Sequence, residues 1–439
     1  MSDLVLPLAM AALTLAGILA GYRVAFVLAG SSAIFILLSD LPIAFFNLIV
    51  SRIYANVLTN WLLVAIPMFI FMGLILEKSG VAENALKGAQ RALGGTAAGM
   101  GIAVLVIGVL LAASSGVVGA SVVLLALLAL PRMVEVGYDK ATSSGLIAAS
   151  GTLAILIPPS VMLIILGDQL QTPVPDMFAG AIGPGLLLVL LYGFYIIWRA
   201  RGLPRAEKAA PIGLLRGVLR TLIDVAPLLI LVLSVLGSII TGLATPTEAS
   251  GLGALGAILV TALYRKFDVG VIMDAARDTV LATSMVMMVI VGATCFSAVF
   301  KGIGGDAMIR DALGAFGTAP WVVLMVVMAA IFVLGFVLDW LEITLILIPI
   351  FAPVIAGLDF GNGLEGQALM IWFGVLVAVN LQTSFLTPPF GFALFYLRGA
   401  AGDQVQTTEI YRGVMPFITL QLFALGLMMV FPWLITGLL

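Results

Sequence analysis

Residues 371–391 read IWFGVLVAVNLQTSFLTPPFG, an apolar run that turns polar at Asn380 and ends in the pair Pro388-Pro389. Residues 150–159 read SGTLAILIPP and place Pro158-Pro159 after small and hydroxyl side chains in the same way. Proline has no backbone N–H, and its ring clashes with the preceding turn. We therefore expect a helix at each place that opens just before its proline pair.

The composition indicates whether water or lipid surrounds these helices. Of 439 residues, 62% are hydrophobic and 10% are charged, too few polar side chains to cover a water-soluble globule of this size. The sequence therefore predicts an all-α, polytopic membrane protein in the lipid bilayer, because a barrel would need alternating polarity. The apolar runs that predict spans are 4–21, 24–38, 61–76, 178–198, 226–240, 249–264, 280–300 and 414–438.

The distribution of basic residues predicts the topology, because cytoplasmic loops of membrane proteins carry the excess of Lys and Arg. An alternating path with both termini in the periplasm leaves all but three of the 20 basic residues inside. The three outside are Arg52, Lys301 and Arg310. This path requires two apolar stretches, 100–131 and 319–357, to enter the bilayer and return on the same side as re-entrant hairpins.

Gly, Pro and small polar residues interrupt the apolar runs at matching places in the two halves, which predicts an internal repeat. The first repeat would span 1–199, with a hairpin at 100–131 and an opened helix at 141–170. A cytoplasmic linker at 200–220 would lead to the second repeat, 221–439, with a hairpin at 319–357 and an opened helix at 366–397. Since the hairpins enter from opposite sides, the repeats are inverted, and interrupted helices in inverted repeats indicate the binding site of a secondary transporter.

Oxygen atoms gather where the helices are expected to open. The freed carbonyls lie near the side-chain oxygens of Ser150, Thr152, Asn380, Thr383 and Thr387, and hard oxygen ligands suit a small cation. The alternative is that these are ordinary proline kinks and packing hydroxyls of membrane helices, and either segment alone fits it. Because the two occur at matched places, we favour a cation site.

Asp339 and Glu342 follow the second hairpin's interruption near Gly335, and a carboxylate at bilayer depth must be paired, hydrated or protonated. Asp339 could face a cation or cap a helix that begins at Trp340, and Glu342 could tie the hairpin to a scaffold. Trp side chains are expected mostly at the ends of spans, as interfacial anchors.

Several separated motifs resemble one family. They are the stretches 137–140 (GYDK), 149–152 (ASGT) with 157–160 (IPPS), 244–249 (ATPTEA) and 380–391 (NLQTSFLTPPFG). They are similar to those of the large membrane subunit of TRAP transporters, the tripartite ATP-independent periplasmic class, and the resemblance covers essentially the whole chain. It implies a bacterial inner-membrane permease with a fixed scaffold and a transport domain that moves like an elevator, driven by sodium.

The resemblance also implies partners and ligands. A periplasmic binding protein would deliver a small carboxylate, and a small four-helix membrane subunit would be a separate chain, since this one begins directly with its first span. One sodium site would lie between the first hairpin tip and the first opened helix, at Ser114, Ser115, Gly116, Ser150 and Gly151. The second would lie at Gly335, Asp339, Asn380, Thr383 and Thr387.

Other functions fit the composition less well. The chain contains no His, so the usual proton relay near neutral pH is missing and sodium coupling is favoured over proton coupling. An intramembrane enzyme would need a nucleophile with a base or a metal cluster, so no enzyme activity and no cofactor beyond sodium ions are expected. A channel suits paired half-open helices less than alternating access does, and a net charge of −2 gives no support for nucleic-acid binding.

Overall fold

A computed structural model describes residues 2–42, 44–81, 88–89, 96–115, 118–203, 214–315 and 319–439. Within those ranges every regular element is a helix, and seven helices are long and apolar enough to cross a membrane. This confirms the predicted all-α, polytopic fold. Up to residue 200 the helices are α1 (Ser2–Leu19), α2 (Val24–Leu38), α3 (Ala44–Ile53), η1 (Tyr54–Leu58), η2 (Trp61–Val64), α4 (Ala65–Lys78), α6 (Ala97–Ser115), α7 (Val118–Glu135), α8 (Lys140–Thr152), η3 (Leu153–Ile155), α9 (Val161–Gln169) and α10 (Val174–Ala200).

The remaining helices follow the segment predicted as a linker. α11 begins at Leu214, inside the range 200–220, and residues 204–213 lie outside the described part of the chain. The elements from there on are α11 (Leu214–Ile240), α12 (Pro246–Leu263), α13 (Val269–Gly302), α14 (Gly305–Ala315), α15 (Pro320–Leu334), α16 (Trp340–Ile346), α17 (Ile348–Ala356), α18 (Gly366–Leu386), α19 (Phe392–Ala401), η4 (Gly402–Gln404), α20 (Thr407–Val430) and α21 (Trp433–Thr436).

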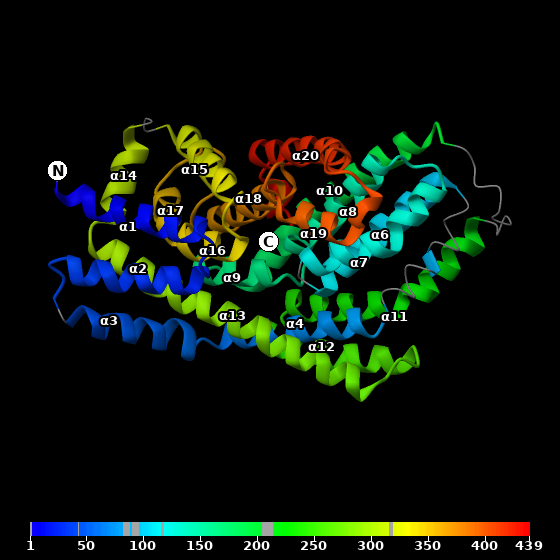
Figure 1. The fold of residues 1–439 in the computed structure, drawn as a ribbon, viewed down its shortest axis with the longest axis horizontal. Helices are drawn as coiled ribbons and strands as arrows, with labels where there is room; N and C mark the ends of the chain where they lie inside the picture. The colour runs from blue at the N-terminus through cyan, green and yellow to red at the C-terminus, as the bar shows by residue number, and fades with distance from the viewer. Residues whose placement is uncertain are drawn as a thin grey trace.

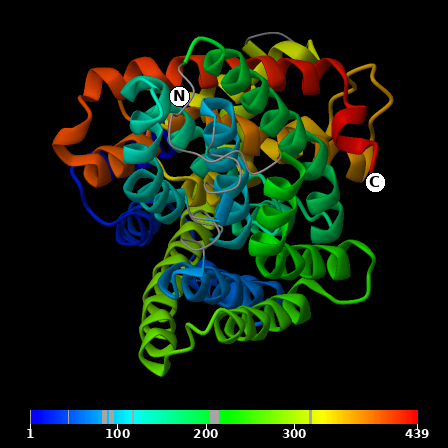
Figure 2. The same ribbon diagram turned by 90° about the vertical axis from the view of Figure 1, so that its right-hand side faces the viewer.

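The helices form two parts, seen one above the other in Figure 1. The lower part, here called the layer, contains α2, α3, α4, α11, α12 and α13, in which α12 packs on α4 and α13 packs on α2 and α4. The upper part, here called the block, contains α6 to α10 and α15 to α20. Figure 2 views the molecule from one end, where the layer projects beneath the rounder block.

The layer exposes apolar side chains that would be unfavourable in water, whereas the centre of the block is buried. On α12, Leu252, Leu255 and Leu259 recur on one helix face and are each at least 60% exposed, an apolar stripe whose natural solvent is lipid. In α18, by contrast, every residue from Leu369 to Leu386 is buried. α18 is therefore the centre of the block, and the polar residues that it carries lie among protein side chains.

Elements from before and after the middle of the chain alternate in the block. α19 packs on α7, and α9 packs on α16; α20 packs on α8, and α10 packs on α18. Each broken helix thus contacts helices from the other end of the chain. This exchange is what two interlocked repeats would produce, and the inverted relation of the repeats stays a prediction.

Both predicted hairpins contain helices on either side of an interruption. α6 ends at Ser115 and α7 begins at Val118, while α15 ends at Leu334 and α16 begins at Trp340. A second break separates α16 from α17 at Leu347, two residues before Pro349.

One tryptophan in the block departs from the position expected at the end of a span. Trp372 is not an interfacial anchor: it is fully buried, its Nε1 donates to the carbonyl of Met428 at 3.0 Å, and it packs edge-on against Trp321 and Phe360. The apolar ring and its single N–H donor are both satisfied inside the protein. Sequence hydropathy did not distinguish this interior tryptophan from one at a bilayer surface.

Candidate functional site

The first broken helix runs through α8 and η3 to α9. Its helical hydrogen bonding stops after Leu153–Ile155 and resumes at Val161, and Pro158-Pro159 lies in the gap with a cis peptide bond. Ser160 lies after the prolines, and its Oγ donates to the carbonyl of Ile155 at 2.6 Å. A side chain thus replaces one of the backbone donors that the gap removes.

The second broken helix is α18 followed by α19. α18 ends at Leu386, Pro388-Pro389 follows with a cis peptide bond, and α19 starts at Phe392. The turn is tight, because a Cβ on Gly391 would stand only 2.5 Å from the carbonyl oxygen of Phe385. Glycine is the residue that lets the chain return this closely on itself.

Ser150 and Gly151 lie at the end of α8 and contact α6 and α7, the helices on either side of the first interruption. A Cβ on Gly108 of α6 would be 2.5 Å from the Cβ of Ser150, and one on Gly151 would be 2.4 Å from Val122 of α7. The Oγ of Ser150 is buried without a hydrogen-bond partner among the described residues. Of the other residues predicted here, Gly116 lies outside the described part of the chain, as do the side chains of Ser114 and Ser115.

The second predicted site comes together around Gly335, which ends α15. A Cβ at Gly335 would be 2.2 Å from the Oγ of Ser384 on α18. Asn380, one helical turn earlier, donates from Nδ2 to the carbonyl of Met328 on α15 at 2.8 Å. The second interruption and α18 are therefore in direct contact through small and polar residues.

The hydroxyls of Thr383 and Thr387 do not point freely into a site. Each donates at 2.8 Å to a carbonyl four residues earlier, that of Val379 and that of Thr383. A hydroxyl that donates in this way keeps lone pairs that can accept or coordinate. Both threonines can therefore still contribute an oxygen to a ligand.

Asp339 caps the helix that follows the second interruption. Its Oδ1 accepts from the backbone N–H of Trp340 at 2.8 Å, and α16 begins at that residue. The capping role considered from the sequence is thereby confirmed. Glu342 is 5% exposed, its Oε2 has no hydrogen-bond partner in the described ranges, and it forms no salt bridge there.

Three further polar residues lie on the helices of the second break and interruption, Gln382 and Ser384 on α18 and Thr344 on α16. Ser384, Thr344 and Gln382 are fully buried, and each has an oxygen without a partner among the described residues. Gln382 also makes a long contact from Nε2 to the Oγ1 of Thr152 at 3.5 Å, between the two broken helices. Ser384 and Gln382 lay within the quoted motif, and the helical spacing of Asn380 and Ser384 was the signal that could have indicated Ser384.

Buried oxygens without donors indicate what the region can do. An unsatisfied buried polar group costs about 1–3 kcal/mol, so several together favour a bound cation or ordered water. No cluster of three or more His, Cys, Asp or Glu occurs in the part of the chain that the structure describes. The donor set is therefore hydroxyl, amide and carbonyl oxygen with the carboxylate of Asp339, which suits an alkali cation better than a transition metal.

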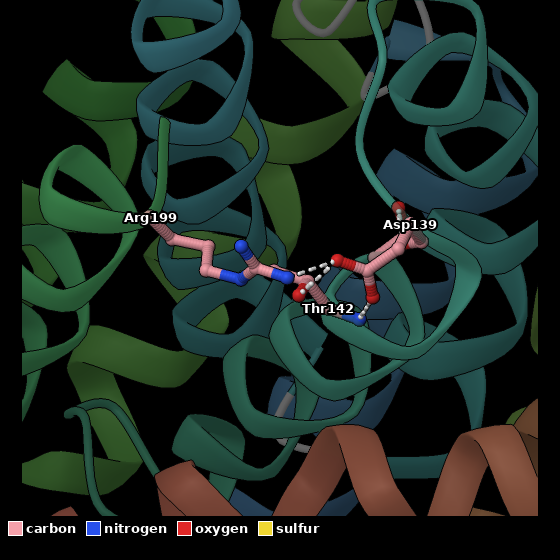
Figure 3. A network of polar contacts seen from close by, with 4 residues as sticks. Asp139, Thr142 and Arg199 are labelled. Atoms are coloured by element: carbon pink, nitrogen blue, oxygen red, sulfur yellow. Dashed lines mark hydrogen bonds and ion pairs between the residues drawn. The ribbon is translucent and has the colours of Figure 1, made fainter. Parts of the chain in front are cut away.

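A polar network fixes the start of α8 (Figure 3). Ser150 lies near the other end of this helix. The carboxylate of Asp139 accepts from the backbone N–H of Thr142 at 2.7 Å and from its hydroxyl at 2.9 Å, and it forms an ion pair with Arg199 of α10 at 2.8 Å. Partial burial alone would raise the pKa of Asp139, but these hydrogen bonds and the Arg199 charge lower it below its ordinary value. The network anchors α8 to α10.

Two broken helices that meet inside an all-helical membrane bundle are typical of membrane transporters. The chain belongs to one family of them: residues 8–434 match the family described as tripartite ATP-independent periplasmic transporter, DctM component. It is thus a large permease of the TRAP type, as its motifs suggested.

Similar proteins agree with that assignment. The chain is 30% identical over 376 residues to the C4-dicarboxylate TRAP transporter large permease protein DctM of Pseudomonas aeruginosa, covering 85% of each. It is 28% identical to the 2,3-diketo-L-gulonate TRAP transporter large permease protein YiaN of Escherichia coli, covering 87% of each. It spans 58% of the isethionate TRAP transporter permease protein DctMQ of Oleidesulfovibrio alaskensis, at 29% identity.

A solved structure shares the fold. The YdaH transporter of Alcanivorax borkumensis superposes with a TM-score of 0.61 over 100% of this chain and 99% of its own, at 14% sequence identity. At that identity the likeness concerns the fold alone.

Proposed function

We propose that this protein performs sodium-coupled uptake of a small organic acid across the bacterial inner membrane. Family membership supports the transport role, and the relatives named above for a C4-dicarboxylate and for 2,3-diketo-L-gulonate support a carboxylate substrate. The observation that carries the proposal is the meeting of the two broken helices, where Ser150, Gln382 and Ser384 bury oxygens without described partners.

Sodium would bind at these breaks. The first site would use Ser150 and Gly151 with the first interruption at Ser114 to Gly116, and the second would use Gly335, Asp339, Asn380, Thr383 and Thr387. The carbonyls freed by Pro158, Pro159, Pro388 and Pro389 would complete the coordination shells. A bound cation would satisfy lone pairs that the described residues leave unpaired, which gives the protein a physical reason to bind it.

Transport would proceed by movement of the block against the layer. Two polar ties join these parts: Asn60 Nδ2 donates to Asp168 Oδ1 at 2.8 Å, and Lys301 Nζ donates to the carbonyl of Pro349 at 3.2 Å. Ties of this kind can break and reform, whereas the buried core of the block would move as one body. Sodium and substrate would favour the same position of the block, which couples their movements.

The proposal includes two protein partners and an orientation. A small four-helix membrane subunit would bind the large one, and a periplasmic binding protein would deliver the substrate. Both termini would be periplasmic, as the distribution of Lys and Arg requires. An alkaline-phosphatase fusion after residue 439 should be active, and an inactive fusion would contradict this orientation.

Reconstitution tests the coupling. The large subunit, the small subunit and the cognate binding protein are placed in liposomes, and thermal-shift titration of the binding protein against a panel of organic acids first identifies the substrate. Uptake should require an inward sodium gradient and should be slow with the large subunit alone. Uptake driven by a proton gradient without sodium would instead favour the buried carboxylates Asp339 and Glu342 as the coupling groups.

A further inference from the structure

A cavity of about 920 Å³ lies between the layer and the block. One wall is a face of α13 with Ile290, Thr294, Ser297 and Lys301, and the facing wall comes from α16 and α17. The end of α3 with η1 and the turn between α9 and α10 also line it, and the cavity is open on one side rather than enclosed. Its size would admit a small organic molecule.

Two cations and one carboxylate line this cavity. Arg52 comes from α3 and Lys301 from α13, and no salt bridge of either is found within the described residues. The carboxylate of Asp168 is already engaged, since it accepts from Asn60 at 2.8 Å and from Gln169 at 3.0 Å. The cavity therefore has a net positive lining whose two cations lack a described acidic partner.

The position of Lys301 follows from the sequence of the facing wall. Pro353 has no N–H, so the carbonyl of Pro349 four residues earlier has no helical donor. Lys301 Nζ donates to that carbonyl at 3.2 Å. A lysine ammonium has three donors, so a single carbonyl acceptor leaves two of them for an anion in the cavity.

The charge distribution along the chain gives a second, independent reason to single out these residues. Only Arg52, Lys301 and Arg310 fall on the outer side in the topology that the basic residues favour, where positive charge is uncommon. Two of those three line this one cavity. Basic side chains at that side therefore gather at a cavity between two parts of the protein and are not spread over loops.

We propose that this cavity is an anion-attracting vestibule, in which Arg52 and Lys301 receive the carboxylate group of the substrate before it reaches the broken helices. The inference rests on the proposed uptake of an organic acid. Cationic walls of low dielectric concentrate anions and raise their rate of entry. Amide groups of Asn56 and Gln169, which also line the cavity, can donate to the same carboxylate.

Thiol chemistry measures the potential in the cavity without transport. In a Cys295→Ala background, Ser297→Cys places a reporter one helical turn from Lys301 on the same face of α13. The assembled complex is treated with an anionic reagent, 2-sulfonatoethyl methanethiosulfonate, and with its cationic trimethylammonium counterpart, each normalised to its rate with a free thiol. Thr294→Cys, on the same wall, is a second reporter if Ser297→Cys fails to fold.

The expected ratio of anionic to cationic rates is well above one. Arg52→Gln and Lys301→Gln should each lower it by about fivefold, and Asp168→Asn should raise it. Arg310→Gln, which removes the third outer cation without touching the cavity, should change it by less than about twofold. A ratio at or below one, or a ratio that Arg52→Gln leaves unchanged, would overturn the proposal.

Uptake by the reconstituted complex tests whether the potential serves the substrate. Arg52→Gln should raise the substrate concentration for half-maximal uptake by about threefold or more while the maximal rate and the sodium dependence stay near those of the parent. An unchanged half-saturating concentration together with a lowered rate ratio would refute the entry role. Failure of the proposed sodium coupling looks different, since uptake would then ignore sodium in every variant while the thiol rate ratios kept their pattern.

Discussion

The first halves of the two broken helices, α8 and α18, are each followed by a Pro-Pro pair, but neighbouring helices hold them in place differently. α8 approaches α20 so closely that a Cβ on Gly145 would be 2.0 Å from the carbonyl oxygen of Gly413, and one on Gly413 would be 1.9 Å from that of Ala141. α18 has large buried side chains and directional hydrogen bonds instead, from Asn380 to Met328 and from Trp372 to Met428.

The contrast shows that a matched sequence pattern fixes where a helix breaks but not how its neighbours hold it. Backbone-to-backbone packing depends on the absence of side chains and has no tolerance for added volume. Side-chain packing with hydrogen bonds can repack around a small change, but it loses energy when a polar partner is removed. Substitutions at the two helices should therefore fail in different ways.

The largest expected effect is at the contact of α8 with α20. Gly413→Ala places a methyl group inside the carbonyl of Ala141, and neither backbone can rotate away, so we expect a loss of about 3 kcal/mol or failure to assemble. Thermal unfolding of the purified complex in detergent measures it. Gly426→Ala on the same helix is the matched control, because its Cβ would meet nothing within 4 Å. Equal stability of the two variants would refute the close contact.

A smaller effect is expected where α15 meets α18. Gly335→Ala brings a Cβ to 2.2 Å from the Oγ of Ser384 and 3.0 Å from its Cβ, a clash that costs about 1–2 kcal/mol. The double variant Gly335→Ala with Ser384→Ala removes the nearer atom and should recover most of the loss. Additive effects in this double-mutant cycle would show that the two residues are not in contact.

The breaks could be placed from the sequence because proline acts locally. Pro158-Pro159 and Pro388-Pro389 remove donors whatever surrounds them, so the gaps before Val161 and Phe392 needed no tertiary information. The all-α membrane fold followed in the same way from composition. The capping role of Asp339 could also be predicted, because a carboxylate directly before a helix start is a capping signal.

The packing of the site could not be read from the sequence. Nothing local distinguishes Ser384, which abuts Gly335, from Thr383, whose hydroxyl turns back to its own helix. The burial of Trp372 and the presence of Arg52 and Lys301 in one cavity likewise depend on contacts between segments far apart in the chain. Such contacts are set by how helices pack, and a hydropathy pattern does not contain them.

Hydroxyl removal at the two breaks compares their roles in sodium binding. Ser150→Ala removes an oxygen without a described partner, so the protein should stay as stable, while the sodium concentration for half-maximal uptake should rise about threefold or more. Ser144→Ala is its control, because that hydroxyl is also buried and unpartnered on α8 but lies away from the break.

The same measurement applies to the second break through Thr387→Val. Thr419→Val on α20 is the control, because Thr419 makes the same type of hydrogen bond to a carbonyl four residues earlier. A rise in the sodium requirement for Thr387→Val but not Thr419→Val would assign an ion to this break. If all four variants show the parent's sodium dependence, the breaks serve packing and the site assignment is wrong.

The smallest effect concerns how α8 and α18 begin. Asp139→Asn keeps an acceptor for the N–H of Thr142 but loses the charge paired with Arg199; both partners are 45% exposed, so we expect a loss of only about 0.5 kcal/mol at neutral pH. The pKa of Asp139 is lowered in the folded protein. Its contribution is therefore present above its ordinary pKa and disappears as the pH falls through the lower folded value. Thermal unfolding from pH 7 to pH 3 should show the gap between parent and variant closing only below about pH 4.

Glu365→Gln is the matched control, since the side chain of Glu365 makes no capping hydrogen bond to α18, and it should leave stability unchanged. A gap that persists undiminished at the acid end would mean that the Asp139→Asn substitution destabilises α8 for a reason other than charge, such as a poorer cap.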